Sequence, residues 1–473
     1  MTRMRLARAR IQGDRLLDVD IDDGRIVALS PAGATPALDH LLDLDGRRLL
    51  PGLWDEHVHV RTWAVSTRRI DVRAATSPEA AVALIRAALP GADPGLPVVA
   101  VGMRDGLWGG APSRRLLDEI APDVPVMVVS SDLHSSWSNA ALGRLLAIDL
   151  DETGMLREAA SFAAATRVES LVADRADAWV LEALAGLGRR GVVGVVDLDF
   201  DDAVGAWERR PAPPVRIDAG VYPQHLEAAE ARGAGTGAPI NGLARVGPLK
   251  VITDGSLGTR TAYCHAPYPG TTGRGVLEVP PDRLVALLRR GAALGLTPAI
   301  HAIGDAANAL ALDAFAEAGV RGRIEHAQLL TETDLARMAA LGIGASIQPE
   351  HMLDDRDLVA RFWGDRAADA FRVGSLLAAG VDVVLGSDAP VTPLDPWFAI
   401  SAAVTRSRDG DPPWQPWEAI DVETALRVSS RTRIAVGEPA DLVALGAEPT
   451  PERLRTMPVD LTLVAGGITH SAL

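Results

Sequence analysis

The middle of the chain alternates short apolar runs of β type with amphipathic helical patterns, and this alternation limits the fold more than any other feature. It is typical of a parallel sheet or barrel whose strands are joined by helices. Eight such runs occur: the first ends near residues 57–59, and the others cover residues 191–197, 215–221, 249–253, 297–301, 322–326, 343–348 and 381–387. Eight strands with helical crossovers predict an α/β protein built on a (β/α)8 TIM barrel, with its chemistry at the carboxyl ends of the strands.

The two ends of the chain have a different texture, because their apolar residues alternate with polar ones at a period of two. Residues 1–52 include "LLDVDIDDGRIVAL", with an Asp-Gly turn signal, and residues 430–473 include "VDLTLVAGGITH". We expect these ends to pair into one small sheet domain beside a barrel of residues 53–429. Residues from about 61 to 155 do not follow the barrel repeat. We expect them to form an insertion after the first strand that acts as a lid or wall of the pocket.

Composition excludes several classes of partner. The 473-residue chain has a net charge of -15 and no clustered basic stripe, which argues against nucleic acid because phosphate binding needs concentrated positive charge. Cys264 is the only cysteine, so neither an intrachain disulfide nor a thiolate zinc cluster can form. No apolar run approaches the roughly 18 residues of a membrane span, and the N-terminal residues lack the apolar core of a signal peptide. We expect a cytoplasmic protein that binds no membrane.

Four histidines and an aspartate stand at the ends of four predicted strands. The segment "DEHVHV" places His57 and His59 two residues apart, so that on a strand both point to one face, about 6.6 Å apart. His301, His326 and Asp388 close three later strands. Each has a simpler alternative, a buried histidine bonded to a carbonyl or an aspartate that caps a turn. Gathered on one face of one barrel, however, they are the ligand types of hydrolytic metal sites.

Lys250 is the only lysine in the chain, and all the other members of the 47 basic residues are arginine. It lies in "LKVITDG", on another predicted strand. Arginine stays protonated at any working pH, whereas a desolvated lysine can lose its proton. A neutral lysine amine can add carbon dioxide to form a carbamate, an anion whose two oxygens can each bind one of two metal ions. The alternative is a lysine retained by chance at the barrel rim.

Several motifs together resemble the amidohydrolase superfamily. They are "PGLWDEHVHV", "LKVITDGSLGTRTA", "AIHAIGD", "RIEHAQ", "ASIQPEH" and "GSDAPVTPLDPW". Within the superfamily the chain looks like the YtcJ-like metal-dependent hydrolases of amidohydrolase family 3, which include N-substituted formamide deformylase. The resemblance extends into the insertion through "APSRRLLDEIAPDVPVMVVSSDLHSSWSNAAL" and "TGMLREAA". It departs at "VETALRVSSRTRIAVGEPADLVAL", which looks shorter than the family's corresponding segment.

The resemblance implies a distorted (β/α)8 barrel, a small β-sandwich built from both termini and a metal centre at the barrel mouth. Carried over position by position, the ligands of a binuclear centre would be His57, His59 and Asp388 for the first divalent ion, His301 and His326 for the second, and carbamylated Lys250 as the bridge. Zinc is the usual metal in such relatives, although nitrogen and oxygen ligands also accept manganese, iron or cobalt.

Such a centre predicts a metal-dependent hydrolase that acts on a carbon–nitrogen bond other than a peptide bond, in a small N-acyl, N-formyl or cyclic amide. The two ions would lower the pKa of a shared water, and the resulting hydroxide would attack the substrate carbonyl. We expect Asp388 to take the proton of the water and return it to the leaving nitrogen. The alternative is that Asp388 is a ligand only. Lys250 and Asp388 are therefore the predicted catalytic residues.

Five substrate-binding residues are predicted. His134 and Trp137, in the insertion, match a segment of the subfamily and either line the pocket or pack. Tyr222 and Gln348 stand at the carboxyl ends of predicted strands and are expected in the pocket. Asp254 shares a strand face with Lys250 by the period of two, and it either orients that lysine or serves the Asp-Gly turn.

Three further histidines, His225, His265 and His351, also lie near strand ends. We expect them to be wall or structural residues, because the implied ligand set is complete without them.

Other functions are weighed against the hydrolase. A deaminase of the superfamily would use one metal and a glutamate three residues after the third histidine, but Gly304 stands three residues after His301. An ester or lactone hydrolase of the same superfamily and a non-catalytic ligand-binding relative are less favoured alternatives. We expect a small-molecule amide as the partner and leave a homodimer open.

Overall fold

The computed structural model describes residues 3–473 with the exception of residues 12, 14, 35–37, 39 and 131–134. The chain divides into two compact units. Unit 1 comprises residues Met1–Val60 and Leu184–Leu473, and unit 2 comprises residues Arg61–Ala183. Among the described residues, no helix combines the length and the apolar character needed to cross a membrane.

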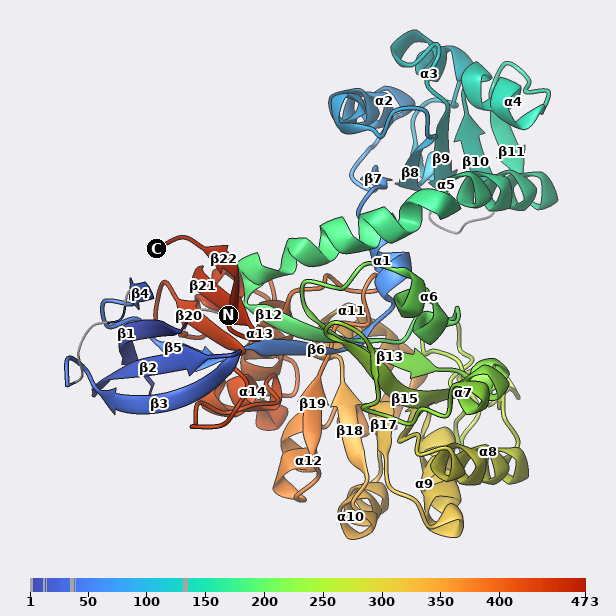
Figure 1. The fold of residues 1–473 in the computed structure, drawn as a ribbon. Coiled ribbons are helices and arrows are strands. Elements are labelled where there is room, and N and C mark those ends of the chain that lie inside the picture. Colours follow the sequence, from blue (N-terminus) through green and yellow to red (C-terminus); the bar gives the residue numbers. More distant parts are fainter. Residues whose placement is uncertain (1–2, 12, 14, 35–37, 39, 131–134) are drawn as a thin grey trace. The chain divides into compact units, whose positions relative to one another are not determined.

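Unit 1 contains an eight-stranded parallel barrel sheet, which confirms the predicted fold class (Figure 1). The strands lie side by side in their order along the chain. They are β6 (Leu53–Val58), β12 (Val192–Asp197), β13 (Arg216–Val221), β15 (Ala244–Ile252), β16 (Pro298–Ala302), β17 (Arg323–His326), β18 (Gly344–Ile347) and β19 (Val383–Leu385). A short extra strand, β14 (Pro239–Asn241), pairs with β15 in the antiparallel sense. Each of the eight predicted runs therefore corresponds to one barrel strand.

Helices join these strands and lie on the outer side of the sheet (Figure 1). Local sequence signals explain several of their starts. Pro281 opens α8 with a pre-set backbone angle, and Thr331 and Asp334 form a reciprocal capping box that begins α10. The helices of unit 1 are α6 (Ala203–Arg209), α7 (Leu226–Arg232), α8 (Pro281–Ala293), α9 (Asp305–Ala318), α10 (Glu332–Leu341), α11 (Pro349–Phe362), α12 (Val373–Ala378), α13 (Pro396–Thr405) and α14 (Val422–Val428).

The first and last barrel strands meet at the carboxyl end of the barrel. All six residues of β6 are buried, as expected of a parallel strand that is covered on both faces. The backbone N–H of Asp388 donates to the carbonyl of His57 at 2.7 Å, and the N–H of His59 donates to the carbonyl of Ala389 at 2.9 Å. These two bonds bring the segment that follows β19 next to the end of β6, so that residues from opposite ends of the barrel sequence share one site.

The chain termini form two four-stranded sheets that share one apolar core. One sheet has the order β3-β2-β1-β4 and the other has the order β22-β21-β20-β5. Leu6, Val19 and Ile26 from the first sheet pack in one cluster with Leu442 and Leu461 from the second. The strands are β1 (Met4–Arg10), β2 (Leu16–Asp22), β3 (Arg25–Pro31), β4 (His40–Asp43), β5 (Leu49–Pro51), β20 (Leu442–Leu445), β21 (Val459–Val464) and β22 (Gly467–Ser471).

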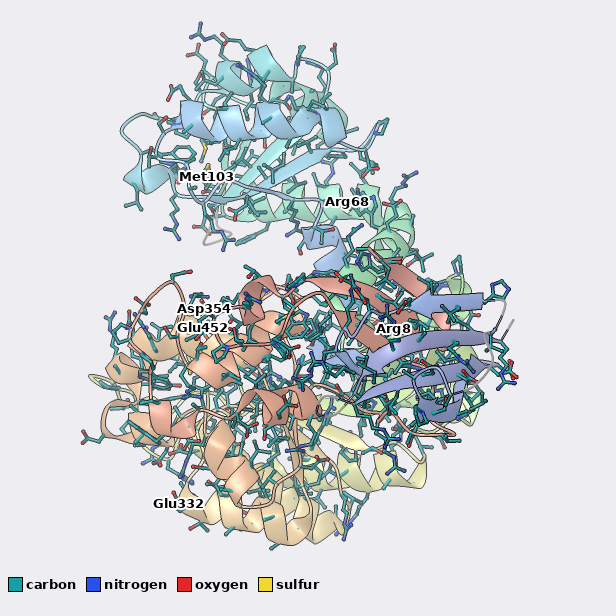
Figure 2. The ribbon with its side chains drawn as sticks, turned by 90° about the vertical axis from the view of Figure 1, so that its left-hand side faces the viewer. Arg8, Arg68, Met103, Glu332, Asp354 and Glu452 are labelled. Carbon is teal, nitrogen blue, oxygen red and sulfur yellow. The ribbon has the colours of Figure 1, made fainter. Side chains whose placement is uncertain are left out.

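A tight turn and a group of ion pairs connect the strands of the first terminal sheet. Asp23 and Gly24, both with positive φ, make the tight turn that joins β2 to β3, and the sequence signalled this turn. Arg8 of β1, which Figure 2 labels, pairs with Asp43 and Asp45 at 2.7 and 2.8 Å. The ion pairs connect β1 to the end of β4, its parallel neighbour.

Unit 2 has its own sheet, of order β11-β10-β9-β8-β7, and its own apolar core, which includes Val98, Val126 and Trp137. It spans residues 61–183, whereas the expected insertion covered about 61–155; the difference is the 27-residue helix α5. Its strands are β7 (Ile70–Asp71), β8 (Val98–Met103), β9 (Val126–Ser130), β10 (Ser135–Ser138) and β11 (Met155–Arg157). The helices of this region are α1 (Val60–Ser66), α2 (Pro78–Ala88), α3 (Arg114–Ile120), α4 (Ala140–Leu146) and α5 (Ala159–Ala185).

Candidate metal centre

The structure brings the six predicted metal-centre residues into one cluster at the carboxyl ends of the barrel strands. His57 is on β6, Lys250 on β15, His301 on β16 and His326 on β17, while His59 and Asp388 directly follow β6 and β19. The rings of His57 and His326 lie 4.8 Å apart between centroids, and those of His301 and His326 lie 4.5 Å apart. The parallel register accounts for this, because equivalent strand ends meet on one rim.

His57, His59 and Asp388 form a compact group of potential ligands. The Nε2 atoms of His57 and His59 lie 3.4 and 3.2 Å from Oδ1 of Asp388. Their ligand atoms all lie within 4.8 Å of one another, which is the spacing a single divalent ion needs. These three residues can therefore hold one metal ion.

Lys250 is buried beside this group. Its side chain is 1 % exposed, and its Nζ lies 3.4 Å from Nε2 of His57. Burial lowers the pKa of Lys250 to about 8, although the carboxylates of Glu325 and Asp388 oppose the shift. A lysine with this pKa has a neutral fraction near physiological pH, and the neutral amine is the form that reacts with carbon dioxide.

The buried histidines are held in their neutral, ligand-competent form. Burial and the nearby charge of Lys250 lower the pKa of His57 to about 4 and that of His301 to about 3. The pKa of His326 is also lowered well below its usual value, by burial and by the neighbouring histidines. Burial opposes ionisation of Asp388, but His57 and His59 hold the pKa of that carboxyl below its usual range. Neutral imidazoles and an ionised carboxylate are the species that bind divalent ions.

A buried carboxylate, that of Glu325, orients the ring of His57. Oε2 of Glu325 accepts a hydrogen bond from Nδ1 of His57 at 2.7 Å, and Arg323 donates to Oε1 of the same glutamate at 2.5 Å. Arg323 also contacts Glu56, which in turn receives two hydrogen bonds from Arg431. The sequence reasoning missed this network. The signal available was the placement of charged residues two apart on a strand that is otherwise buried.

Backbone strain is concentrated at the site. His326 and Asp388 have φ angles of 70° and 58°, in the left-handed region that side chains other than glycine avoid. Such residues cost about 1–3 kcal/mol each and persist where the surroundings impose them, often at functional sites. Two of the predicted ligands are therefore held in strained positions.

A second potential ligand group overlaps the first at Asp388. His326, His351 and Asp388 also have ligand atoms that lie within 4.8 Å of one another. His326 Nδ1 and His351 Nε2 are buried, and neither has a hydrogen-bond partner among the described residues. An unpaired buried polar atom costs about 1–3 kcal/mol, and a bound cation would satisfy these nitrogens. The donor set therefore fits a divalent metal ion.

Two of the predicted substrate-binding residues, Tyr222 and Gln348, lie near the metal cluster. Tyr222 donates its hydroxyl hydrogen to the carbonyl of Leu198 at 2.8 Å, and its ring lies 5.5 Å from Phe200, which stacks on His59 at 4.9 Å. Gln348 is buried, and its Nε2 donates to the carbonyl of Ser346 at 3.2 Å and lies 3.5 Å from Nδ1 of His57. Their contact with substrate stays a prediction.

Asp254 has backbone partners. Its carboxylate accepts hydrogen bonds from the N–H groups of Tyr263, Ile303 and Gly304 at 2.9–3.0 Å. Its Oδ1 also lies 3.4 Å from Nε2 of His301. Burial raises the pKa of Asp254 to about 7. The residue therefore ties the loop after β15 to the end of β16 and faces His301; no contact with Lys250 is found among the described residues.

The predicted substrate contacts of the insertion have no supporting geometry. Trp137 has no exposed surface and packs in the core of unit 2, near Trp108 at 6.3 Å between ring centroids, which is the packing alternative. His134 lies outside the described residues.

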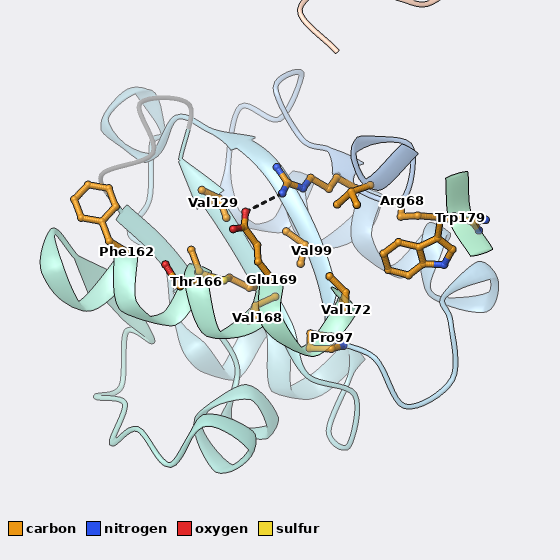
Figure 3. A pocket seen from close by; sticks show the side chains of 14 residues that line it. Arg68, Pro97, Val99, Val129, Phe162, Thr166, Val168, Glu169, Val172 and Trp179 are labelled. Carbon is orange, nitrogen blue, oxygen red and sulfur yellow. Dashed lines mark hydrogen bonds and ion pairs between the residues drawn. The ribbon is translucent and has the colours of Figure 1, made fainter. Parts of the chain in front are cut away.

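Unit 2 also contains an apolar cavity of about 280 Å³ between α5 and its sheet (Figure 3). Val99, Val129, Val172 and Trp179 line it, and Glu169 pairs with Arg69 at its edge. Neither Trp137 nor any residue of the metal cluster is among its lining residues.

A parallel barrel that presents histidines, an aspartate and a buried lysine at its carboxyl rim defines a metal-dependent hydrolase. The chain belongs to the amidohydrolase family, whose model matches residues 40–470. This confirms the resemblance that the motifs indicated.

Individual relatives agree with this assignment. The chain is 29% identical to the protein LONG AFTER FAR-RED 3 of Arabidopsis thaliana, over 81% of this chain and 73% of the relative. It is 25% identical to the amidohydrolase YtcJ of Bacillus subtilis, over 97% of both chains, and 24% identical to the N-substituted formamide deformylase of Arthrobacter pascens, over 93% and 91%. A solved structure of an uncharacterized metal-dependent hydrolase from Pyrococcus furiosus matches with a TM-score of 0.77 and 26% identity, over 95% of this chain and 100% of that one.

Proposed function

We propose that the protein hydrolyses the carbon–nitrogen bond of a small amide, formamide or cyclic amide at a centre of two divalent ions, most simply zinc, bridged by carbamylated Lys250. His57, His59 and Asp388 would hold the first ion, and His301 and His326 the second. When bound, such ions lower the pKa of water and polarise a carbonyl group. An amide from the small-molecule pool is the proposed partner.

The observation that carries the proposal is the position of Lys250. An ammonium group at this buried position is unfavourable, because burial opposes its charge, and a cation held by the neighbouring histidines would oppose it further. The pKa of about 8 reflects the burial. Conversion of the amine to a carbamate would replace the positive charge with a negative one and remove this opposition when cations bind.

The residues around the cluster have separable roles in this chemistry. Asp388 Oδ1 lies 3.4 and 3.2 Å from Nε2 of His57 and His59, and the ionised carboxylate would take a proton from water and deliver it to the leaving nitrogen. Glu325 keeps His57 in the tautomer whose Nε2 faces the cluster. Phe200 is 54% exposed and stacks on His59, so it offers an apolar surface beside the reacting centre.

Deamination is disfavoured by backbone packing as well as by sequence. A Cβ atom at Gly304 would lie 2.0 Å from the backbone oxygen of Tyr263. This position therefore excludes any side chain, including the glutamate that a deaminase of the superfamily would place there. The relative named N-substituted formamide deformylase supports a formamide or another N-acyl compound as the substrate class.

The test is a hydrolysis screen of zinc-loaded protein against N-formyl, N-acetyl and cyclic amides, with matched esters and lactones beside them. We expect release of an amine from at least one N-acyl compound, together with about two metal equivalents per chain. Faster turnover of esters or lactones than of every amide would reject the proposed bond specificity, and protein that binds no metal when supplied with it would reject the proposal altogether.

A further inference from the structure

We propose that His351 is a ligand of the second metal ion, together with His326 and Asp388. This inference rests on the proposed two-metal function and adds a residue that was expected from its place near a strand end to be a wall or structural residue.

Local sequence places His351 at the rim of the site. Gln348 precedes α11 and Pro349 opens it, so His351 lies in the first turn of the helix, and its N–H donates to the carbonyl of Gln348 at 3.1 Å. Side chains of helical residues point back toward the N-terminus of the helix. The N-terminus of α11 follows the carboxyl end of β18, so His351 is directed toward the barrel mouth.

One nitrogen of the His351 imidazole is buried without a hydrogen-bond partner among the described residues. The residue is 8% exposed, and the nitrogen is Nε2. A structural histidine of this kind is expected to donate to or accept from a neighbouring polar group, because an unpaired buried nitrogen is costly. The nearest charged atom to Nε2 is Oδ2 of Asp388, at 3.6 Å.

The two carboxylate oxygens of Asp388 face different histidines. Oδ1 lies close to His57 and His59, and Oδ2 faces His351. The ring of His351 lies 6.0 Å from that of His326 with an interplanar angle of 14°. One carboxylate is therefore shared by two groups of histidines, so that it can contact two neighbouring cations.

His301 leaves room for an additional ligand at the second ion. Its Nε2 lies 3.2 Å from the carbonyl oxygen of Gly255 and 3.4 Å from Oδ1 of Asp254, so this nitrogen already has polar neighbours. His326 and His351 instead present unpaired nitrogens. With His326, His351, Asp388 and the carbamate as ligands, a zinc ion that accepts four or five ligands would keep one position, for His301 or for the attacking water.

The first experiment counts metal ions in wild-type protein and in His351→Ala and His351→Asn variants, after loading with zinc and removal of unbound ion. We expect about two equivalents in the wild type and about one in either variant. His265→Ala is the matched control, because His265 is exposed and belongs to neither ligand group, and it should keep both ions. Retention of two ions by a folded His351→Ala variant would overturn the inference.

A second variant gives a positive signal. His351→Cys loaded with cobalt should show a thiolate-to-cobalt charge-transfer absorption band if position 351 contacts the ion. The background is low because Cys264, the only native cysteine, is buried and burial raises the pKa of its thiol. Thermal unfolding in the presence of a chelator checks that each variant is folded. A folded cysteine variant that binds cobalt without this band would also overturn the inference.

The same preparations separate this inference from the proposed function. Wild-type protein that binds two ions, loses one in the His351 variants and hydrolyses no amide would reject the proposed substrate class and support His351 as a ligand. Wild-type protein that hydrolyses an amide, with His351 variants that keep both ions, would support the proposed substrate class and reject His351 as a ligand.

Discussion

Glu325 and His57 form a buried carboxylate–imidazole pair, with 2.7 Å between Oε2 and Nδ1. The short contact fixes the proton on Nδ1, so that the lone pair of Nε2 faces Asp388 and Lys250. A metal ligand that is oriented in this way binds more tightly, because its ring orientation and tautomer are set before the ion arrives.

Replacement of Glu325 by Gln should therefore weaken metal binding by about 10- to 100-fold, the usual cost of losing a supporting carboxylate. The amide can still accept one hydrogen bond, so the fold should be retained while the charge is lost. The measurement is competition with a chromophoric chelator. Glu317→Gln, at an exposed position, serves as the control and should leave the affinity unchanged. An unchanged affinity in Glu325→Gln would show that the pair serves stability alone.

Substitution of Lys250 tests the bridge. Lys250→Arg keeps a positive charge and approximate length but cannot form a carbamate, so we expect the turnover number to fall by more than the roughly 100-fold that loss of a supporting residue costs. Lys250→Ala should lose activity as well, and acetate should restore part of it by placing a carboxylate at the position of the proposed carbamate. The check is steady-state kinetics on any substrate found in the hydrolysis screen. A fully active Lys250→Arg variant would exclude the carbamate.

The sequence predicted the barrel and the position of the cluster because both depend on local and repeated signals. Apolar runs of β length define strands, and a residue at the end of a run must lie on the carboxyl rim once the strands are parallel. This reasoning located His57, His301 and Asp388. It could not locate His351 as a neighbour of Asp388, because that contact depends on the direction of a helical side chain rather than on a strand end.

The length of the insertion and the role of Trp137 were equally hard to foresee. Unit 2 ends at Ala183, within the last turn of α5. An unbroken helix carries no sequence signal at the boundary between two units. Trp137 sits on a short strand whose residues are all buried, so the alternation that would mark one face for packing is missing.

The buried ion pairs below the site predict a large effect on stability. Arg431 donates to Glu56 at 2.5 and 2.6 Å and to Asp218 at 2.5 Å, and its guanidinium lies 3.6 Å from the ring centroid of Trp54. Removing one partner of a fully buried pair costs about 3–5 kcal/mol, but the side chain of Arg431 is 32% exposed and Arg323 stays in contact with Glu56. Arg431→Met should therefore lower the free energy of unfolding in urea by about 1–3 kcal/mol, the cost of the acceptors left unpaired.

The control for Arg431→Met is Arg433→Met, two residues further along the chain. The side chain of Arg433 is 80% exposed and pairs with Glu438 at 3.0 Å. Exposed ion pairs contribute about 0–1 kcal/mol, so this variant should unfold almost as the wild type does. Equal effects of the two substitutions would argue that the network below the barrel contributes little.

Asp197 predicts a pH dependence of stability with a defined sign. Its carboxylate accepts hydrogen bonds from the backbone N–H groups of Val60 and Asp199 and from Nε1 of Trp207. Burial, with a smaller contribution from the charge of Asp199, raises the pKa of Asp197 from 3.8 to about 6. Between these two values the folded protein holds a proton that the unfolded chain has lost. A rise in pH across this window therefore destabilises the folded state, by at most about 1.4 kcal/mol per pH unit for one group.

Asp197→Asn cannot titrate and isolates this contribution from that of the other carboxyl groups. The free energy of unfolding of the wild type minus that of Asp197→Asn should decrease as the pH rises from 4 to 6, and should level off on either side of this window. Asp365→Asn, at an exposed position, is the control. The free energy of unfolding of the wild type minus that of this variant should not show the decrease between pH 4 and 6. Urea unfolding at closely spaced pH values supplies the measurement. A difference that stays constant, or that increases with pH, would mean that Asp197 is ionised in the folded protein throughout the window and that its three hydrogen-bond donors outweigh the effect of burial.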